Sequence, residues 1–118
     1  MVDDATLDSL WDYLWWHHRG RHKAVKSSFL RRHFNLSNRE LIEATRTLNI
    51  ERRKPVCSST KGEYRGIFAA RSPAELADYA ADLKKRSMGI FERMAAINKI
   101  LAAFEGQSEF DFDATRQA

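Results

Sequence analysis

Two short helical patterns followed by a predicted β-hairpin occupy residues 17–71, and this order of elements restricts the fold more than any other feature. The second helical pattern opens with Ser37 and has Glu40 three residues later, which is the spacing of a capping box at a helix N-terminus. Its inner stripe consists of Leu41, Ala44, Thr45 and Leu48. We therefore predict a capped amphipathic helix over 37–48.

The first helical pattern runs from about Lys23 to Phe34. We expect its inner positions to be Val25, Phe29, Leu30 and Phe34. Asn35 to Ser37 separate the two helical patterns, so we expect a tight turn there with Leu36 in the core.

The hairpin is expected over Pro55–Ala70, with its turn at residues 60–63, where Gly62 can adopt a positive φ. Gly66 disturbs the alternation of the return strand, which indicates a β-bulge. Helix, turn, helix and hairpin in this order predict a winged helix-turn-helix, a mainly α fold with a small β-hairpin. Such domains usually place the second helix in a DNA major groove and the hairpin near a phosphate backbone.

An additional helix is expected before this region, with Thr6 as its N-cap and an end near His17 or His18 ahead of Gly20. Its helically spaced apolar residues are Leu7, Leu10, Trp11, Leu14 and Trp15. Trp11 and Trp15 share the leucine face, which favours a role in the core. Trp16 lies off that face, and the aromatic cluster could instead be a stacking platform for single-stranded nucleic acid.

A long helix is predicted after the hairpin, with Ser72 as N-cap, Pro73 in its first turn and Glu75 completing a second capping box. Its apolar residues recur at alternating spacings of four and three and form a seam along one side of the helix. Over 32 residues the helix would be about 48 Å long, more than a domain this small needs. The seam consists of Leu76, Ala80, Leu83, Ser87, Ile90, Met94, Ile97, Leu101 and Phe104. We predict a homodimer through residues 76–104, with the first helix, the chain's own domain or another protein as alternative partners.

The predicted organisation is a winged helix-turn-helix domain over 5–71, the long C-terminal helix over 72–105, and a flexible acidic tail over 106–118. No apolar run approaches the roughly 20 residues that span a bilayer, and the first residues lack the features of a secretory signal. The single cysteine, Cys57, excludes an internal disulfide. We expect a cytoplasmic protein that does not contact a membrane.

Charge is distributed unevenly along the 118 residues, whose net charge is +4. Residues 1–12 hold four Asp and no Lys or Arg, whereas residues 17–54 hold eleven Lys and Arg against three Glu, a net +8. The positive charge therefore coincides with the predicted helix-turn-helix, as expected of a phosphate-binding face. Ordinary solvation of an Arg-rich surface is the alternative interpretation.

Residues for catalysis are poorly represented, so we predict no enzyme activity, no cofactor and no metal site. His18 and His22 would have a metal-ligand spacing only in a helix that continues through Gly20, which is not expected. Cys57 has no neighbouring base, and the five glycines form no phosphate-binding loop.

Binding of double-stranded DNA is better supported. Arg39 and Arg46 could donate to guanine edges or phosphates, Asn38 could pair with adenine, and Glu43 lies on the same outer side. Arg52, Arg53 and Lys54 suit contacts with the DNA backbone, as does Lys61 at the hairpin tip.

The chain resembles small winged-helix proteins encoded by bacteriophages and prophages over residues 7 to about 100. The matching segments are the helix opening at 37–41, the strand entry at 55–59 and the start of the long helix at 70–76. This resemblance implies DNA binding as a replication accessory or a transcription regulator. The irregular strand at Arg65 and Gly66 departs from the pattern.

The acidic tail contains Gln107, Phe110 and Phe112, which resemble the short peptide by which bacterial replication proteins dock on the sliding clamp. Phe110 stands where leucine is usual. Docking on another protein and an uninvolved tail are the alternatives. A wider alternative for the whole chain is a protein-interaction module that recruits a replication or transcription partner through its long helix and tail, without contacting DNA.

Overall fold

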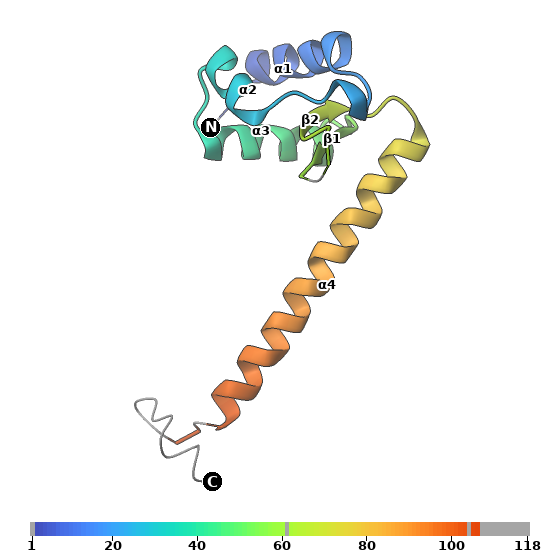
Figure 1. Cartoon of the computed structure of the whole chain (residues 1–118). Coiled ribbons are helices and arrows are strands. Elements are labelled where there is room, and N and C mark those ends of the chain that lie inside the picture. Colours follow the sequence, from blue (N-terminus) through green and yellow to red (C-terminus); the bar gives the residue numbers. More distant parts are fainter. Residues whose placement is uncertain (1, 61, 104, 107–118) are drawn as a thin grey trace. The chain divides into compact units, whose positions relative to one another are not determined.

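The computed structural model describes residues 2–60, 62–103, 105 and 106. It is mainly helical with a two-stranded antiparallel sheet and a long C-terminal helix, which confirms these parts of the predicted fold (Figure 1). The chain divides into an N-terminal unit, residues 1–80, and a second unit, residues 81–118. In chain order the elements are α1 (Asp4–His17), the 3₁₀ turn η1 (Arg21–Lys23), α2 (Ser27–Phe34), α3 (Asn38–Ile50), β1 (Val56–Ser59), β2 (Gly66–Ala69) and α4 (Pro73–Ala103).

The core of the N-terminal unit joins the three short helices to the hairpin. Figure 1 shows α1 and α3 along opposite sides of this unit, with the hairpin at one end. The buried residues that connect them are Leu7, Leu10, Leu14, Val25, Leu30, Leu41, Ala44, Leu48, Val56 and Ala69. Trp11 and Trp15 stack at 5.6 Å between ring centroids and pack against this core, as predicted, whereas Trp16 is 70% exposed.

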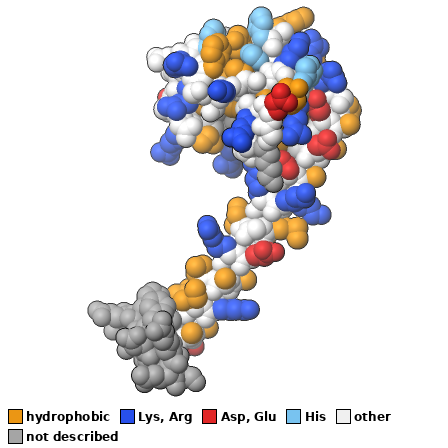
Figure 2. Space-filling view, in the orientation of Figure 1, with side chains coloured by type: hydrophobic (Ala, Val, Ile, Leu, Met, Phe, Trp, Pro, Cys, Tyr) orange, Lys and Arg blue, Asp and Glu red, His pale blue; other side chains and the backbone are white. Residues whose placement is uncertain are grey.

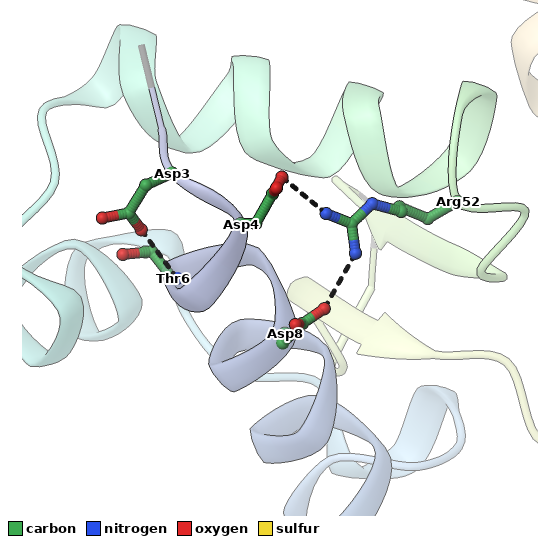
Figure 3. Close-up of polar contacts among 5 residues, drawn as sticks. All are labelled: Asp3, Asp4, Thr6, Asp8 and Arg52. Atoms are coloured by element: carbon green, nitrogen blue, oxygen red, sulfur yellow. Dashed lines mark hydrogen bonds and ion pairs between the residues drawn. The ribbon is translucent and has the colours of Figure 1, made fainter.

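Helix α1 begins earlier than the sequence indicated, because Asp3 and not Thr6 is its N-cap. The Asp3 carboxylate accepts a hydrogen bond from the Thr6 N–H at 2.8 Å, as Figure 3 shows. Hydrogen bonding to Thr6 lowers the pKa of Asp3 below its ordinary value. A carboxylate at this position also interacts favourably with the positive end of the helix dipole.

Helix α2 is shorter than predicted, since it begins at Ser27 and not near Lys23. The chain before it is extended at Val25, which forms an antiparallel bridge with Ile67. Val25 and Ile67 exchange both main-chain hydrogen bonds, at 2.9 and 2.8 Å, so tertiary pairing prevents helix formation there. Phe29, predicted to point inward, is 41% exposed.

The turn and the capping box before α3 are confirmed. Asn35 adopts the left-handed conformation, and the half-buried Leu36 donates its N–H to the Arg31 carbonyl. Ser37 and Glu40 exchange the two hydrogen bonds of a capping box, and donation from the Ser37 main chain and hydroxyl lowers the pKa of Glu40. Helix α3 continues to Ile50, two residues beyond the predicted end.

The hairpin is also confirmed, with Val56 opposite Ala69 and Ser59 opposite Gly66. Gly62 in the turn has φ +79°. Gly66 forms no bulge, contrary to the prediction, because it stays in register with Ser59. Its φ is +136°, and a Cβ there would overlap the Val25 carbonyl group. Glycine is needed at 66 because the main chain at residue 25 approaches the strand closely.

Helix α4 begins at Pro73, with Ser72 accepting a hydrogen bond from the Glu75 N–H at 3.3 Å. The predicted second capping box is only half formed. The Glu75 carboxylate accepts from the Arg71 N–H at 2.9 Å and from the Arg21 N–H at 3.1 Å, and thus ties α4 to η1. Tyr79 packs against the small cluster of Cys57, Phe68 and Ala70.

The predicted seam lies on one continuous helix, and none of its described residues is buried. Exposed apolar members include Leu83, Ile90, Met94, Ile97 and Leu101, with exposed fractions of 44–67%. Phe104 lies outside the described residues. No helix in the described part of the chain is long and apolar enough to cross a membrane.

Candidate nucleic-acid interface

Helix α3 presents a polar, cationic side to solvent. Its capping box fixes the first turn, and Leu41, Ala44 and Leu48 hold the opposite side in the core. Arg39 and Arg46 are seven residues apart, so they lie on the same side about 10 Å from each other along the axis. The predicted contact residues on α3 are all exposed: Asn38, Arg39, Glu43 and Arg46.

Arg39 and Arg46 make no ion pair with any residue that the structure describes. Glu43 lies four residues after Arg39 and three before Arg46, yet it forms no ion pair with either within the described chain. Within the described residues, both guanidinium groups thus keep their donors for an external acceptor. Arginine offers a planar set of donors that matches the two acceptors of a guanine edge or the oxygens of a phosphate.

Apolar side chains accompany the arginines on the exposed side of α3. Ile42 is 59% exposed and lies between Arg39 and Arg46 in the sequence, while Ile50 at the end of the helix is 60% exposed. An apolar side chain at such a position can contact the methyl group of thymine. The sequence placed Ile42 on the outer side of α3, but it gave no reason to treat either isoleucine as a contact.

Arg52 is held by α1. Its guanidinium donates to Asp4 at 2.7 Å and to Asp8 at 2.8 Å, and Figure 3 shows both carboxylates turned toward it. The hydrogen bond to Asp8, supported by the charges of both aspartates, raises the pKa of Arg52. Arg52, which was predicted to contact a DNA phosphate, therefore has two partners within the chain. These contacts join the segment just after α3 to the first turns of α1.

Arg53 and Lys54 continue the exposed cationic surface after α3. Arg53 adopts a left-handed conformation with φ +57°, and the Lys54 ammonium lies 5.6 Å from the centroid of the Trp11 ring. The Asn49 amide fixes this connector by donating to the carbonyls of Lys54 at 2.8 Å and Val56 at 3.1 Å. The sequence gave no indication of this role for Asn49.

Two predicted contact regions fall outside the described residues. Lys61 at the hairpin tip is one, and the tail residues Gln107, Phe110 and Phe112 are the other. In the described part of the hairpin loop, Arg65 is exposed and donates its Nε–H to the Gly62 carbonyl at 3.3 Å. Arg65 is a further exposed cation in this loop, and the sequence gave no reason to treat it as a contact. Figure 2 shows Lys and Arg side chains spread over the visible face of the N-terminal unit, with fewer Asp and Glu between them.

Groups for covalent or metal chemistry are not assembled in the described chain. No cluster of three His, Cys, Asp or Glu residues with a metal-binding arrangement occurs among the described residues. Cys57 is 1% exposed, and burial, with a smaller effect of the Glu75 charge, raises its pKa to about 12. The thiol is thus held in its protonated, poorly nucleophilic form.

A comparison with protein-family models, curated proteins and solved structures finds no match to this chain.

Proposed function

We propose that this chain binds double-stranded DNA through α3, as a winged helix-turn-helix protein. The order of α1, the bridge at Val25, α2, α3 and the hairpin supports this fold. Three residues, 35–37, separate α2 from α3, which is the length of the turn in helix-turn-helix motifs. In such motifs the second helix enters the major groove and the first crosses the backbone.

The observation that carries the proposal is the open cationic side of α3. Its 13 residues give a rod about 20 Å long, and a major groove roughly 12 Å wide accepts a helix of this diameter. Arg39 and Arg46 would donate to guanine edges or phosphates, Asn38 would pair with adenine, and Glu43 would accept from a cytosine amino group. Arg53 and Lys54 would contact the flanking phosphates.

The test is a salt-titrated duplex-binding assay on the full chain and on an Arg39→Ala/Arg46→Ala variant. Both arginines are exposed, so the fold should survive their removal. The control variant, Lys85→Ala/Lys99→Ala, removes the same number of charges from exposed positions on α4. Affinity for the wild type should fall steeply with salt, because binding to phosphates releases counterions.

The binding free energy of the α3 variant should be weaker by about 1–3 kcal/mol for each arginine that contacts a base. The loss should be smaller for an arginine that contacts only a phosphate. The control should bind within about twofold of the wild type, because each exposed charge outside the interface contributes little. Equal affinities for the α3 variant and the wild type at every salt concentration would reject the proposal.

A second candidate function follows from the exposed seam of α4. Monomeric proteins rarely expose large contiguous apolar patches, so this seam favours association with a second copy or with another protein. We favour a homodimer, in which the 3.5-residue spacing would let two seams pack as a coiled coil. If α4 only recruits a partner and α3 does not touch DNA, heparin and random duplex should retain the Arg39→Ala/Arg46→Ala/Arg53→Ala variant as well as the wild type.

The resemblance to phage and prophage winged-helix proteins extends the proposal to a biological process. It implies a replication accessory or a transcription regulator, which would act in the bacterial cytoplasm, where the DNA lies. A tail that docks on the sliding clamp through Gln107, Phe110 and Phe112 would favour replication. Loss of clamp binding in a Phe110→Ala/Phe112→Ala variant, measured with purified clamp, tests that part separately.

A further inference from the structure

A cluster of aromatic and imidazole rings surrounds Tyr13 on α1 and α2, and the proposed duplex binding does not use it. The rings of His17, His18, Phe29, His33 and Phe34 all lie within 4.8–6.4 Å of the Tyr13 ring, measured between centroids. Trp16, on the same half of α1, is 70% exposed. Figure 2 shows histidine and hydrophobic side chains gathered at the edge of the N-terminal unit formed by α1 and α2, with Lys and Arg beside them.

The rings of Tyr13, Phe29 and His33 are nearly parallel. Their planes differ by 15–25°, and their centroids are 4.8, 5.7 and 6.4 Å apart. Since the two shorter distances together far exceed the longest, the rings form a triangle and not a linear stack. Phe29 is 41% exposed and His33 is exposed, so part of this ring group is accessible to a ligand.

Two depressions that share His17 border the ring cluster. The first has a volume of about 540 Å³ and is lined by the cationic side chains of Lys23, Lys26 and Arg32, together with Phe29. No Asp or Glu belongs to its described lining. Within the described residues no side chain caps the start of α2, so main-chain N–H groups of its first turn, next to Lys26, add to the positive potential.

The second depression has a volume of about 410 Å³ and a different chemical character. Its lining includes the rings of Tyr13, Trp16 and His33 and the carboxylate of Asp12. Aromatic rings can stack on a nucleobase, and a carboxylate can accept a hydrogen bond from the amino group of a base. The first depression thus suits a phosphate and the second suits a base.

We propose that this surface binds single-stranded nucleic acid, with its backbone at Lys23, Lys26 and Arg32 and unpaired bases at Trp16 and at the exposed rings of Phe29 and His33. Proteins that bind single strands combine a positive groove with aromatic rings in this way. Neither depression includes a residue of α3, so the site does not use the residues proposed to enter the major groove. The proposal does not depend on duplex binding, and either activity can fail alone.

The experiment measures binding of the full chain to a labelled deoxythymidine oligonucleotide of about 12 nucleotides, within the range of known single-strand sites. Trp16→Ala and Phe29→Ala should each lower the affinity about tenfold, as loss of one stacking ring does, while Trp16→Phe should retain most of it. Lys26→Ala/Arg32→Ala should reduce the slope of log affinity against log salt by roughly 1.4, since two phosphate contacts are lost.

A duplex arm separates this site from α3. The Trp16→Ala and Phe29→Ala variants should bind duplex within about twofold of the wild type, whereas Arg39→Ala/Arg46→Ala should bind the single strand within the same limit. A parallel titration with oligouridine shows whether DNA or RNA is the preferred strand. Unchanged circular dichroism of the Trp16 variants confirms that the exposed ring is not needed for folding.

Single-strand affinity that is equal in the wild type and in the Trp16 and Phe29 variants would overturn the proposal. Equal losses for single strand and duplex in these variants would also overturn it, because they would indicate one shared site. Absence of binding to both oligonucleotides would leave the rings as a surface for a protein partner and would equally reject nucleic acid.

Discussion

The N-terminal unit and the helix beyond residue 80 contain similar apolar periodicities but differ in what covers them. Helices α1 and α3 bury their leucines to exposed fractions of 3% or less. The described residues of α4 beyond residue 80 are exposed or half-buried, although its seam is longer and as regular. Periodicity therefore identifies an apolar side of a helix, but it does not identify the partner that covers that side.

The difference arises from the connections between elements. The short turn at 35–37, the connector fixed by Asn49 and the bridge at Val25 bring α1, α2, α3 and the hairpin together. Tyr79, near the start of α4, packs against the cluster of Cys57, Phe68 and Ala70. No further helix or strand follows α4 in the described chain, so none can fold back and cover the rest of the helix. In the proposed dimer, a second molecule would supply this surface.

The largest contrast should appear when one apolar side chain is truncated in each region. Leu10→Ala removes a side chain that is fully buried, and the cavity should lower the free energy of unfolding by about 2–5 kcal/mol. Ile97→Ala removes a side chain that is 50% exposed and should change it by less than about 0.5 kcal/mol. Urea denaturation followed by tryptophan fluorescence reports on the N-terminal unit, since all the tryptophans lie on α1.

A charge placed in the seam of α4 tests the proposed dimer. Ile97→Asp should shift the full chain toward monomer in sedimentation experiments, because a charge would replace an apolar seam residue. Lys85→Asp, at an exposed position on the opposite side of α4, is the control and should leave the association unchanged. A wild type that is monomeric at high concentration would contradict self-association and favour a different protein as the partner.

The sequence predicted the order of elements, the turn before α3 and the hairpin because these depend on local signals. A capping box, a Gly-bearing turn and a leucine stripe each lie within a few residues. Three details were wrong because distant residues decide them. Val25 pairs with a strand some 40 positions away, Gly66 faces the main chain at residue 25, and Glu75 binds the Arg21 N–H.

In the candidate site, too, the features set by local sequence were predictable and those set by distant residues were not. The exposed side of α3 was predictable, because residues off the inner stripe of a helix face solvent. The contacts of Arg52 with Asp4 and Asp8 were not, since they join positions more than 40 residues apart. The opposite net charges of residues 1–12 and 17–54 were a visible signal that these segments attract each other.

Replacing one glycine in each region with alanine should change stability in opposite directions and by an intermediate amount. Gly66→Ala introduces a Cβ that overlaps the Val25 carbonyl group at a φ of +136°, so it should destabilise the N-terminal unit by about 1–3 kcal/mol. Gly89→Ala meets open space within α4 and should stabilise that helix by roughly 0.5–1 kcal/mol. Thermal unfolding monitored by circular dichroism measures both. A Gly66→Ala variant as stable as the wild type would contradict the close approach of residue 25.

The smallest effect is a pH dependence at the contact between the first turn of α4 and η1, both of which lie in the N-terminal unit. Burial alone would raise the pKa of Glu75, but the N–H groups of Arg71 and Arg21 and the nearby positive charges outweigh it, so the pKa lies below its ordinary 4.5. A lowered folded-state pKa means that the ionised carboxylate stabilises the fold above pH 4.5, and that this stabilisation disappears as the pH falls through the folded-state value.

Glu75→Gln should therefore be less stable than the wild type at neutral pH, and the difference should shrink as the pH is lowered below about 4.5. Urea titrations at a series of pH values measure this difference, with Glu92→Gln on α4 as the control for loss of one charge. A difference between wild type and Glu75→Gln that stays constant down to the acid range would mean that the carboxylate contributes through its shape and not through its charge. In that case the contacts with Arg71 and Arg21 would be ordinary neutral hydrogen bonds, and the contact between α4 and η1 would not depend on ionisation.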